Sequence, residues 1–304
     1  MSGKSISIVI PMHNEEGNVD LVYHEVKNVC EEIKTEKGYD YEIIFINDGS
    51  TDKTLEKLKT IKELDPKVRI LNMDRNRGQA AALTAGFQLA RGDLIFTIDG
   101  DGQNDPKYLK ELLQKLEDGY KVATGYRIKR KEPLLTRKLP SFIANRLIAL
   151  VTGLKVRDNG CSLKGYVAEI PKRVQIPHGF HRFLPALFGV KNEEVVEIPV
   201  LDRKRYWGRS HYGLKRTFEV LRELITFPFL RKSEFYEKFF KIWGYLHIIL
   251  FVPVAIWFII KPDLLKVALL LALLSGAIVS YIIHKNLKRF NLSQKEGVFR
   301  IKEL

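Results

Sequence analysis

The chain has 304 residues, 45% hydrophobic and 28% charged, which excludes a globally disordered chain and gives a core large enough to need no disulfides. Its formal charge of +14 is uneven, because residues 1–125 hold 17 Lys and Arg against 22 Asp and Glu, whereas residues 126–304 hold 33 against 14. A basic half of this kind usually meets nucleic acid, anionic lipid or phosphate groups.

Apolar runs of strand length alternate with helical patterns through the first 125 residues. Short β-branched runs predict strands at residues 5–11, 41–47, 68–73, 93–99 and 121–125. Apolar residues at helical spacing predict helices between them, at residues 16–37, 51–64, 79–90 and 106–118. This alternation predicts an α/β domain with a mostly parallel sheet, whose ligands bind beyond the carboxyl ends of the strands.

The rest of the chain is less regular until two long apolar runs near its end. One helix is predicted over residues 139–152. Residues 242–260 carry no formal charge, and a second apolar run covers residues 264–283, after a Lys-Pro-Asp turn. Each run is long enough to cross a bilayer, so the pair predicts a transmembrane hairpin. The alternative is a buried helical hairpin of a soluble domain. Basic residues beyond the outer ends of both runs favour a cytoplasmic location for the two ends.

Two aspartates follow the predicted strand at 93–99 directly. Asp99 and Asp101 are separated by one glycine, and Gln103 comes two residues later. Two carboxylates at this spacing can curl around one hard divalent cation, and Mg²⁺ or Mn²⁺ often bridges such a site to a phosphate. A polar turn is the alternative, but the preceding strand and the Gln-Asn-Asp-Pro that follows favour a metal site.

Two further polar loops end strands of the same sheet. The first predicted strand ends in Pro-Met-His-Asn-Glu-Glu, and the second ends in Asn-Asp-Gly-Ser-Thr-Asp. Either loop alone reads as an ordinary helix cap. Three such loops at one sheet edge are hard to explain as caps alone, so we expect a binding site there.

Over residues 5–226 the chain resembles family-2 glycosyltransferases of the GT-A fold. More closely, it is similar to the branch that moves a sugar from a nucleotide sugar to a polyprenyl phosphate, the dolichyl-phosphate mannose synthase group and its undecaprenyl-phosphate relatives. The resemblance rests on motifs that occur together in this order: SIVIPMHNEE, FINDGSTDKT, RNRGQAAALTAGFQLARGD, DGDGQNDP, VATGYR, RDNGCSLKGY, HRFLPAL and RYWGRSHYGLKR.

The resemblance implies roles for individual residues. It implies a nucleotide-sugar site of Pro11, Asn14, Glu15, Asp48, Asp99 and Asp101. It implies a cation site of Asp99, Asp101 and Gln103, and a site for the acceptor phosphate of Arg127, Arg137, Ser141 and Arg205. Asp101, Asp158 and Arg127 are then the expected catalytic residues. His211 stands where the family often has lysine, which puts one secondary contact in doubt.

The physics of the acceptor agrees with this assignment. Arginine binds phosphate bidentately and stays charged, which gives the basic half of the chain a purpose. A phosphate is already largely ionised at neutral pH, so we expect inverting transfer without a strong general base, and Asp158 then orients the sugar or stabilises charge at its ring. The expected partners are a UDP- or GDP-hexose, an undecaprenyl or dolichyl phosphate and the lipid bilayer, without nucleic acid. Two spans are also compatible with a homo-oligomer.

The implied organisation is a GT-A catalytic domain over residues 1–228, a juxtamembrane amphipathic segment over 229–241, two transmembrane helices within 242–284 and a basic cytoplasmic tail over 285–304. The protein is then a cell-membrane protein with its catalytic domain on the cytoplasmic face. Two alternatives stay open. One is a processive polysaccharide synthase, although the chain has no QxxRW motif. The other is a non-catalytic, membrane-tethered protein that binds nucleotide sugars.

Overall fold

The chain forms two compact units in a computed structural model that describes residues 4–128, 139–205, 207, 214–296 and 299–304. For residues 139–145, 214–218 and 295–296 it describes the backbone alone. We call residues 1–213 with 297–304 the sheet unit and residues 214–296 the hairpin unit, and describe each on its own.

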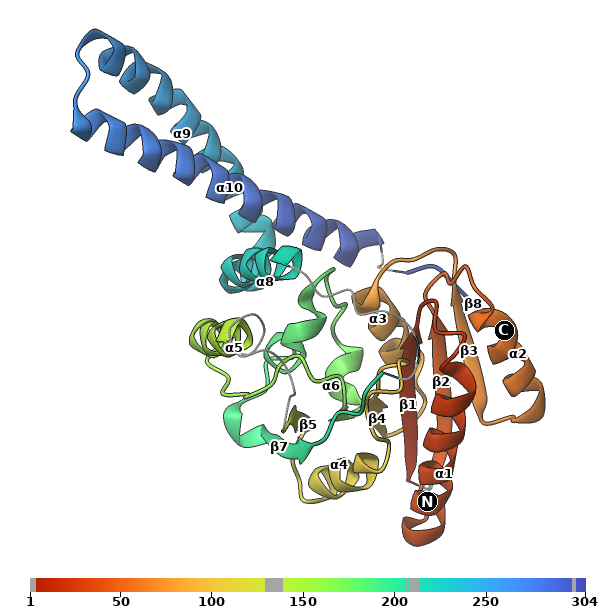
Figure 1. The fold of residues 1–304 in the computed structure, drawn as a ribbon. Coiled ribbons are helices and arrows are strands. Elements are labelled where there is room, and N and C mark those ends of the chain that lie inside the picture. Colours follow the sequence, from red (N-terminus) through yellow and green to blue (C-terminus); the bar gives the residue numbers. More distant parts are fainter. Residues whose placement is uncertain (1–3, 129–138, 206, 208–213, 297–298) are drawn as a thin grey trace. The chain divides into compact units, whose positions relative to one another are not determined.

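An eight-stranded sheet runs through the sheet unit in the order β7-β5-β6-β4-β1-β2-β3-β8 (Figure 1). Its strands are β1 (Ser5–Met12), β2 (Asp40–Asn47), β3 (Val68–Met73), β4 (Leu94–Thr97), β5 (Val122–Arg127), β6 (Lys164–Val167), β7 (Val195–Val200) and β8 (Ile301–Glu303). Strands β1 to β4 are parallel to one another and β5 is parallel to β7, whereas β6 and β8 are antiparallel to their neighbours. The predicted α/β class with a mostly parallel sheet is confirmed.

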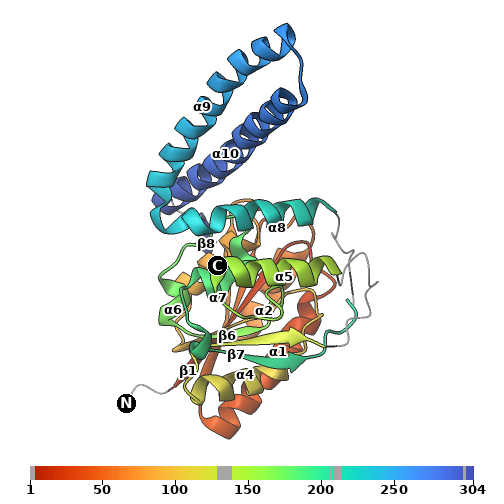
Figure 2. The ribbon, with the colours of Figure 1, turned by 90° about the vertical axis from the view of Figure 1, so that its left-hand side faces the viewer.

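Helices cover both faces of this sheet (Figures 1 and 2). The helical segments are α1 (Val19–Lys37), α2 (Thr54–Leu64), α3 (Gln79–Leu89), α4 (Tyr108–Glu117), α5 (Leu139–Thr152), α6 (Glu169–Lys172), α7 (Leu184–Leu187) and the 3-10 turns η2 (Phe180–Phe183) and η3 (Asn192–Glu194). Helices α1, α2 and α4 share one hydrophobic core with alternate residues of β1 and β2. Every second residue of β1 and β2 and the helically spaced apolar residues of α1 therefore pack in one core.

Helix α3 covers the opposite face of the sheet and is buried nearly all round. Its alanines leave little side chain, so the helix lies close to β1. At Gly86 a Cβ atom would stand 2.3 Å from Cγ1 of Val9, far inside van der Waals contact. Glycine at this position therefore sets the distance between helix and sheet.

We expect Gly86→Ala to lower the free energy of unfolding by about 1 to 2 kcal/mol, because overpacking outweighs the helix propensity that alanine adds. Thermal melting of the purified protein measures this change. The control is Gln88→Ala, an exposed position on the same helix, which should melt as the wild type does. Equal stability of Gly86→Ala and wild type would contradict the close contact of α3 with Val9.

The parallel register brings three strand ends together. Met12 pairs with Asn47 at the ends of β1 and β2, and the N–H of Asp48 donates to the carbonyl of Met12 at 2.8 Å. On the other side of β1, the N–H of Ile98 donates to the carbonyl of Val9 at 3.2 Å. The loops after β1, β2 and β4 consequently leave the sheet at the same edge.

The hairpin unit consists of α8 (Leu214–Thr226), the 3-10 segment η4 (Phe227–Lys232) and two long helices, α9 (Ser233–Ile260) and α10 (Leu264–Glu296). Small residues let the long helices approach closely, since a Cβ on Gly276 would stand 2.3 Å from the ring of His247. Both helices are long and apolar enough to span a membrane, and little of their most apolar stretch is buried. This low burial argues against the alternative of a buried helical hairpin.

The first turn of α10 holds a buried lysine. The side chain of Lys266 is 2% exposed, and its Nζ lies 3.0 Å from Oδ2 of Asp263 and 4.1 Å from the ring centroid of Trp257. The aspartate therefore neutralises the charge of Lys266, and the aromatic face of Trp257 stabilises it further.

The structure differs from the sequence-based elements in several places. Helix α10 continues to Glu296 instead of ending near 283, and residues 301–303, expected in a tail, form the edge strand β8. Strands β6 and β7 had no counterpart in the predictions. Glu303 pairs with Arg69 of β3 at 2.7 Å, and Arg69 also binds Glu42 of β2 at 2.7 Å. Strand β8 thus covers the edge of β3 with both a backbone ladder and a charge pair.

Candidate active site

The loops after β1 and β2 are joined by side-chain hydrogen bonds. Asn14 adopts a left-handed conformation with φ of 55°, which asparagine tolerates better than most residues. Its Oδ1 accepts the N–H of Thr51 at 2.8 Å, and its own N–H donates to Oγ of Ser50 at 3.0 Å. The N–H of Glu15 donates to Oγ1 of Thr54 at 2.9 Å. These bonds fix Asn14 and Glu15 at the carboxyl edge of the sheet.

Asp48 fixes the next loop along the edge. Its Oδ1 accepts the N–H of Arg77 at 2.7 Å, and its Oδ2 accepts the N–H of Gly78 at 2.9 Å. Gly49 has φ of 62°, and a Cβ there would stand 2.3 Å from the backbone of Arg75. The carboxylate therefore holds the loop before α3. A contact between Asp48 and a nucleobase stays a prediction.

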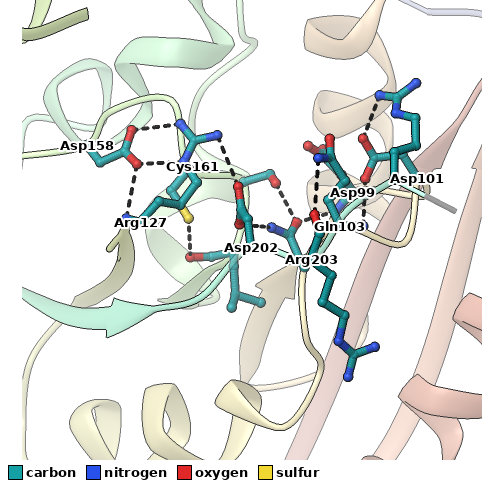
Figure 3. A network of polar contacts seen from close by, with 12 residues as sticks. Asp99, Asp101, Gln103, Arg127, Asp158, Cys161, Asp202 and Arg203 are labelled. Atoms are coloured by element: carbon teal, nitrogen blue, oxygen red, sulfur yellow. Dashed lines mark hydrogen bonds and ion pairs between the residues drawn. The ribbon is translucent and has the colours of Figure 1, made fainter. Parts of the chain in front are cut away.

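The loop between β4 and α4, residues 98–107, carries the two predicted metal ligands, Asp99 and Asp101. We call it the acidic loop. Asp101 is 8% exposed, and Gly102, with φ of 73°, turns the chain so that the N–H of Gln103 donates to Oδ1 of Asp101 at 3.0 Å. Gln79 donates to Oδ1 of Asp99 at 3.0 Å. Gly100 has room for no side chain, since a Cβ would lie 2.9 Å from the carbonyl oxygen of Pro11. The loop is thus ordered by its neighbours, and Figure 3 shows both carboxylates on it.

Gln103 is turned toward the segment that follows β7. Its Nε2 lies 3.4 Å from the carbonyl oxygen of Arg203, and the N–H of Arg203 donates to the carbonyl of Gln103 at 2.8 Å. The acidic loop and this segment are therefore held together by backbone. A role for Gln103 as a metal ligand stays a prediction.

The carboxylates of Asp99 and Asp101 fit a divalent cation that is also held by the phosphate oxygens of a bound substrate. Within the described part of the chain, no three His, Cys, Asp or Glu side chains are arranged to enclose a metal ion. Mg²⁺ and Mn²⁺ are commonly held by one or two carboxylates together with phosphate oxygens. Asp101 already faces a cationic group, because Nη2 of Arg205 lies 2.7 Å from its Oδ2. The carboxylates can therefore accept a positive charge at this point.

Glu15 adds a third carboxylate to the same region. Its Oε2 accepts a hydrogen bond from Asn18 at 2.5 Å, and Nη1 of Arg205 lies 3.8 Å from its Oε1. Burial, reinforced by the charges of Asp101 and Asp99, raises the pKa of Glu15 to about 7. Burial and the charge of Asp101 also raise the pKa of Asp99 to about 6. Concentrated negative charge of this kind is a common feature of functional sites.

A buried arginine lies on the other side of the acidic loop, at the end of β5. Arg127 binds Asp158 in a bidentate pair, with Nε to Oδ2 at 2.7 Å and Nη2 to Oδ1 at 2.8 Å, and both side chains are 12% exposed. Asp202 lies 3.6 Å from Nη1 of Arg127 and 3.4 Å from Nδ2 of Asn104 (Figure 3). Asp202 therefore connects the arginine to the acidic loop.

A lysine that the sequence analysis did not single out lies in the same region. Lys164 begins β6 and is 2% exposed, and its Nζ lies 3.4 Å from the carbonyl oxygen of Asn159. Burial lowers its pKa, while the nearby Cys161, Asp158 and Asp99 act in the opposite direction. A charged residue within a buried strand was the signal that could have identified it. Asp202, two residues after β7, carried no comparable signal.

The structure brings some of the predicted residues into contact. Arg205 lies beside Asp101 and Glu15, and Arg127 pairs with Asp158. The others lie at the ends of β1, β2 and β4 or on the loops that follow them, namely Pro11, Asn14, Asp48, Asp99 and Gln103. Arg137 lies outside the described residues, and the side chain of Ser141 does as well. Arg205 was expected to bind an acceptor phosphate, and here it binds a carboxylate of the predicted metal site.

Cation binding at this site should weaken as the pH falls. The carboxyl groups must release their protons when a cation binds. With a pKa of about 7 for Glu15 and about 6 for Asp99, we expect Mn²⁺ affinity to fall by up to about tenfold per pH unit between pH 7 and 6, and by up to about a hundredfold per unit below pH 6, where both groups must lose a proton. Mn²⁺ titrations across this range measure it, and Glu15→Gln should remove the decline between pH 7 and 6. An affinity that is constant from pH 8 to 5.5 would contradict the raised pKa values.

Comparison with known proteins relates the chain to a family. Residues 7–174 match the family described as glycosyl transferase family 2. The chain is 39% identical over 231 residues to a dodecaprenyl-phosphate galacturonate synthase from Rhizobium johnstonii, covering 75% of this chain and 67% of the relative. It is 33% identical over 224 residues to an undecaprenyl-phosphate 4-deoxy-4-formamido-L-arabinose transferase from Photorhabdus laumondii, covering 73% and 67%.

Two solved structures share the fold. Glucosyl-3-phosphoglycerate synthase from Mycobacterium tuberculosis, in complex with Mn²⁺, UDP-glucose and phosphoglyceric acid, has a TM-score of 0.55 at 17% identity, over 74% of this chain and 78% of that one. A mannosyltransferase from Pyrobaculum calidifontis, in complex with GDP-mannose and Mn²⁺, has a TM-score of 0.53 at 14% identity, over 97% and 88%. At these identities the likeness concerns the GT-A-like fold alone.

Proposed function

Because the chain belongs to glycosyl transferase family 2, we propose that it is a membrane-bound enzyme that transfers a hexose from a nucleotide sugar to a polyprenyl phosphate. The acceptor class is supported by two relatives, both named for polyprenyl phosphates and similar over about three quarters of the chain. That observation carries the proposal. The two apolar helices fit it, because the acceptor is itself a membrane lipid.

The donor half of the site is proposed at the carboxyl ends of β1, β2 and β4. Pro11, Asn14, Glu15 and Asp48 would contact the nucleoside, and Asp99, Asp101 and Gln103 would hold a divalent cation, Mg²⁺ or Mn²⁺. Bound there, the cation would offset the negative charge of the leaving diphosphate. The ordered acidic loop supports this proposal, since hydrogen bonds from Gln79 and from the N–H of Gln103 already hold the carboxylates of Asp99 and Asp101.

The acceptor half is proposed around arginines from the basic half of the sequence. Arg127, Arg137, Ser141 and Arg205 would bind the lipid phosphate, whose charge a guanidinium matches in a bidentate geometry. Arg127 is held in a fixed orientation by Asp158, at 2.7 and 2.8 Å. The role that fits Asp158 is therefore to orient Arg127 and the sugar, not to remove a proton.

The transfer is a displacement at the anomeric carbon. An oxygen of the acceptor phosphate attacks that carbon opposite the nucleoside diphosphate, a new carbon–oxygen bond forms, and the bond to the diphosphate breaks with its electron pair leaving on oxygen. The configuration inverts. A phosphate monoester is largely ionised at pH 7, so no residue has to act as a strong base. Positioning and charge neutralisation are the contributions of the chain.

The proposed location is the cytoplasmic side of the cell membrane. Lys238, Lys241, Lys285, Lys288 and Arg289 lie toward the outer ends of α9 and α10, where the positive-inside rule favours the cytoplasm. Both ends of a two-helix hairpin lie on one side of the bilayer, so the catalytic residues would lie there as well.

The experiment is a transfer assay with membranes that contain the protein. Labelled UDP- and GDP-sugars, a short polyprenyl phosphate and Mg²⁺ or Mn²⁺ are combined, and label that enters the organic phase is counted. One donor should give lipid-linked sugar, and EDTA should abolish it. The readout also separates the alternatives. A processive synthase gives polymeric product instead, and a non-catalytic protein binds the nucleotide sugar without releasing labelled product.

A further inference from the structure

Two arginines of the segment after β7 point to different partners. The side chain of Arg203 pairs with Glu25 at 2.7 Å and with Asp105 at 2.9 Å. Arg205, two residues later, pairs with Asp101 at 2.7 Å and lies 3.8 Å from Glu15. Backbone hydrogen bonds between Arg203 and Gln103 hold this segment against the acidic loop. Arg203 therefore makes ion pairs near the surface, whereas Arg205 makes them with the carboxylates of the proposed metal site.

The Arg205 guanidinium occupies a place that a metal ion would use. Asp101 is 8% exposed, and Oδ1 already accepts the N–H of Gln103, so Oδ2 is the oxygen that faces the site. Nη2 of Arg205 donates a hydrogen bond to that oxygen at 2.7 Å. The side chains of Asp101, Glu15 and Arg205 are 10%, 15% and 25% exposed, so water screens their charges only in part. A cluster of carboxylates at this depth requires a counter-charge.

We propose that Arg205 is an internal counter-cation of the metal site, which competes with the divalent ion for Asp101 and is released when the ion binds. The guanidinium and the metal ion are both positively charged and would lie beside the same oxygen, Oδ2 of Asp101, so their mutual repulsion makes the two contacts compete. Arg205 therefore stabilises the acidic loop before the donor arrives. Its release would leave a positive charge beside the bound diphosphate, where the proposed function places the acceptor phosphate. The inference rests on that function only in taking Asp101 as a metal ligand.

The competition is tested by Mn²⁺ affinity without any nucleotide or lipid. The full chain in detergent is titrated with Mn²⁺, and the free ion is measured by electron paramagnetic resonance. We expect Arg205→Ala to bind Mn²⁺ about tenfold more tightly than wild type, which corresponds to the loss of one charge-assisted hydrogen bond. Arg205→Lys keeps the charge but loses the fixed geometry of the guanidinium, and should lie between the two.

Arg203→Ala is the matched control. It removes the same charge from the same segment, but its partners are Glu25 and Asp105, so its Mn²⁺ affinity should stay within about twofold of wild type. Equal tightening in both alanine variants would mean that net charge and not competition is responsible. Unchanged or weaker binding in Arg205→Ala would overturn the proposal, as would a lack of Mn²⁺ binding in every variant. If Arg205→Ala has a lower melting temperature than wild type, Arg205→Gln is titrated in its place.

The Mn²⁺ titration does not depend on sugar transfer, so the proposed function and the proposed role of Arg205 can fail separately. If no polyprenyl-linked sugar forms but Arg205→Ala binds Mn²⁺ more tightly, the acceptor is wrong and the counter-cation stands. If transfer occurs and the affinities of Arg205→Ala and wild type are equal, the function stands and the counter-cation is wrong.

Discussion

Replacing Asp101 with alanine is expected to lower the rate of sugar transfer by at least about a thousandfold. The substitution removes the buried carboxylate whose outward oxygen faces Arg205 and the proposed cation. Without it, the leaving diphosphate loses the cation that would offset its charge. Release of labelled lipid-linked sugar at saturating donor and acceptor measures the rate.

The control for this variant is Asp105→Ala, four residues along the same loop. Asp105 pairs with Lys107 and Arg203 and not with Arg205, so its loss should change the rate less than about threefold. Melting curves of both variants show whether the loop still folds. An Asp101→Ala protein that melts normally and retains a tenth of the wild-type rate would exclude Asp101 from the metal site.

Removing the charge of Arg127 should damage both the fold and the reaction. The Arg127–Asp158 pair is nearly buried, and breaking a buried pair on one side costs about 3 to 5 kcal/mol, because the other charge stays unpaired. For a unit of this size that corresponds to a melting temperature lower by roughly 10 °C. We expect Arg127→Met to show this loss and to reduce transfer by more than about a hundredfold.

A double variant separates the two effects. Arg127→Met with Asp158→Asn removes both charges, and the asparagine oxygen can still accept the backbone N–H of residue 127 that Asp158 accepts at 3.2 Å. We expect it to recover most of the melting temperature and none of the activity. Recovery of activity along with stability would show that the pair is structural and has no part in binding phosphate.

The regular first half of the sheet could be predicted, because each of its strands is a short apolar run beside a helix of ordinary length. Strand β6 could not, since it has four residues and begins with the buried Lys164. Strand β7 contains Pro199, which argues against a strand in a sequence read alone. In both cases the neighbouring strands stabilise a segment whose own sequence gives a weak signal.

The site divides in a similar way. Strand ends at one edge follow from the topology, so the loops with Asn14, Asp48 and Asp101 could be expected to lie near one another. The pairing of Arg205 with Asp101 joins residues 104 positions apart. No spacing rule predicts such a contact, because it depends on how the segment after β7 meets the acidic loop.

Strand β8 has a consequence for how the protein is made. It comes from residues 301–303, yet it pairs with β3, which ends at Met73. At about 5 to 20 residues per second, a ribosome adds the intervening stretch in roughly 10 to 50 seconds. Throughout that time the edge of β3 has no partner, and an open edge invites pairing with other chains. The two long helices are synthesised within the same interval. Both long helices are therefore synthesised before the strand that closes the sheet, and a pause during their synthesis would prolong exposure of an aggregation-prone edge on the nascent chain.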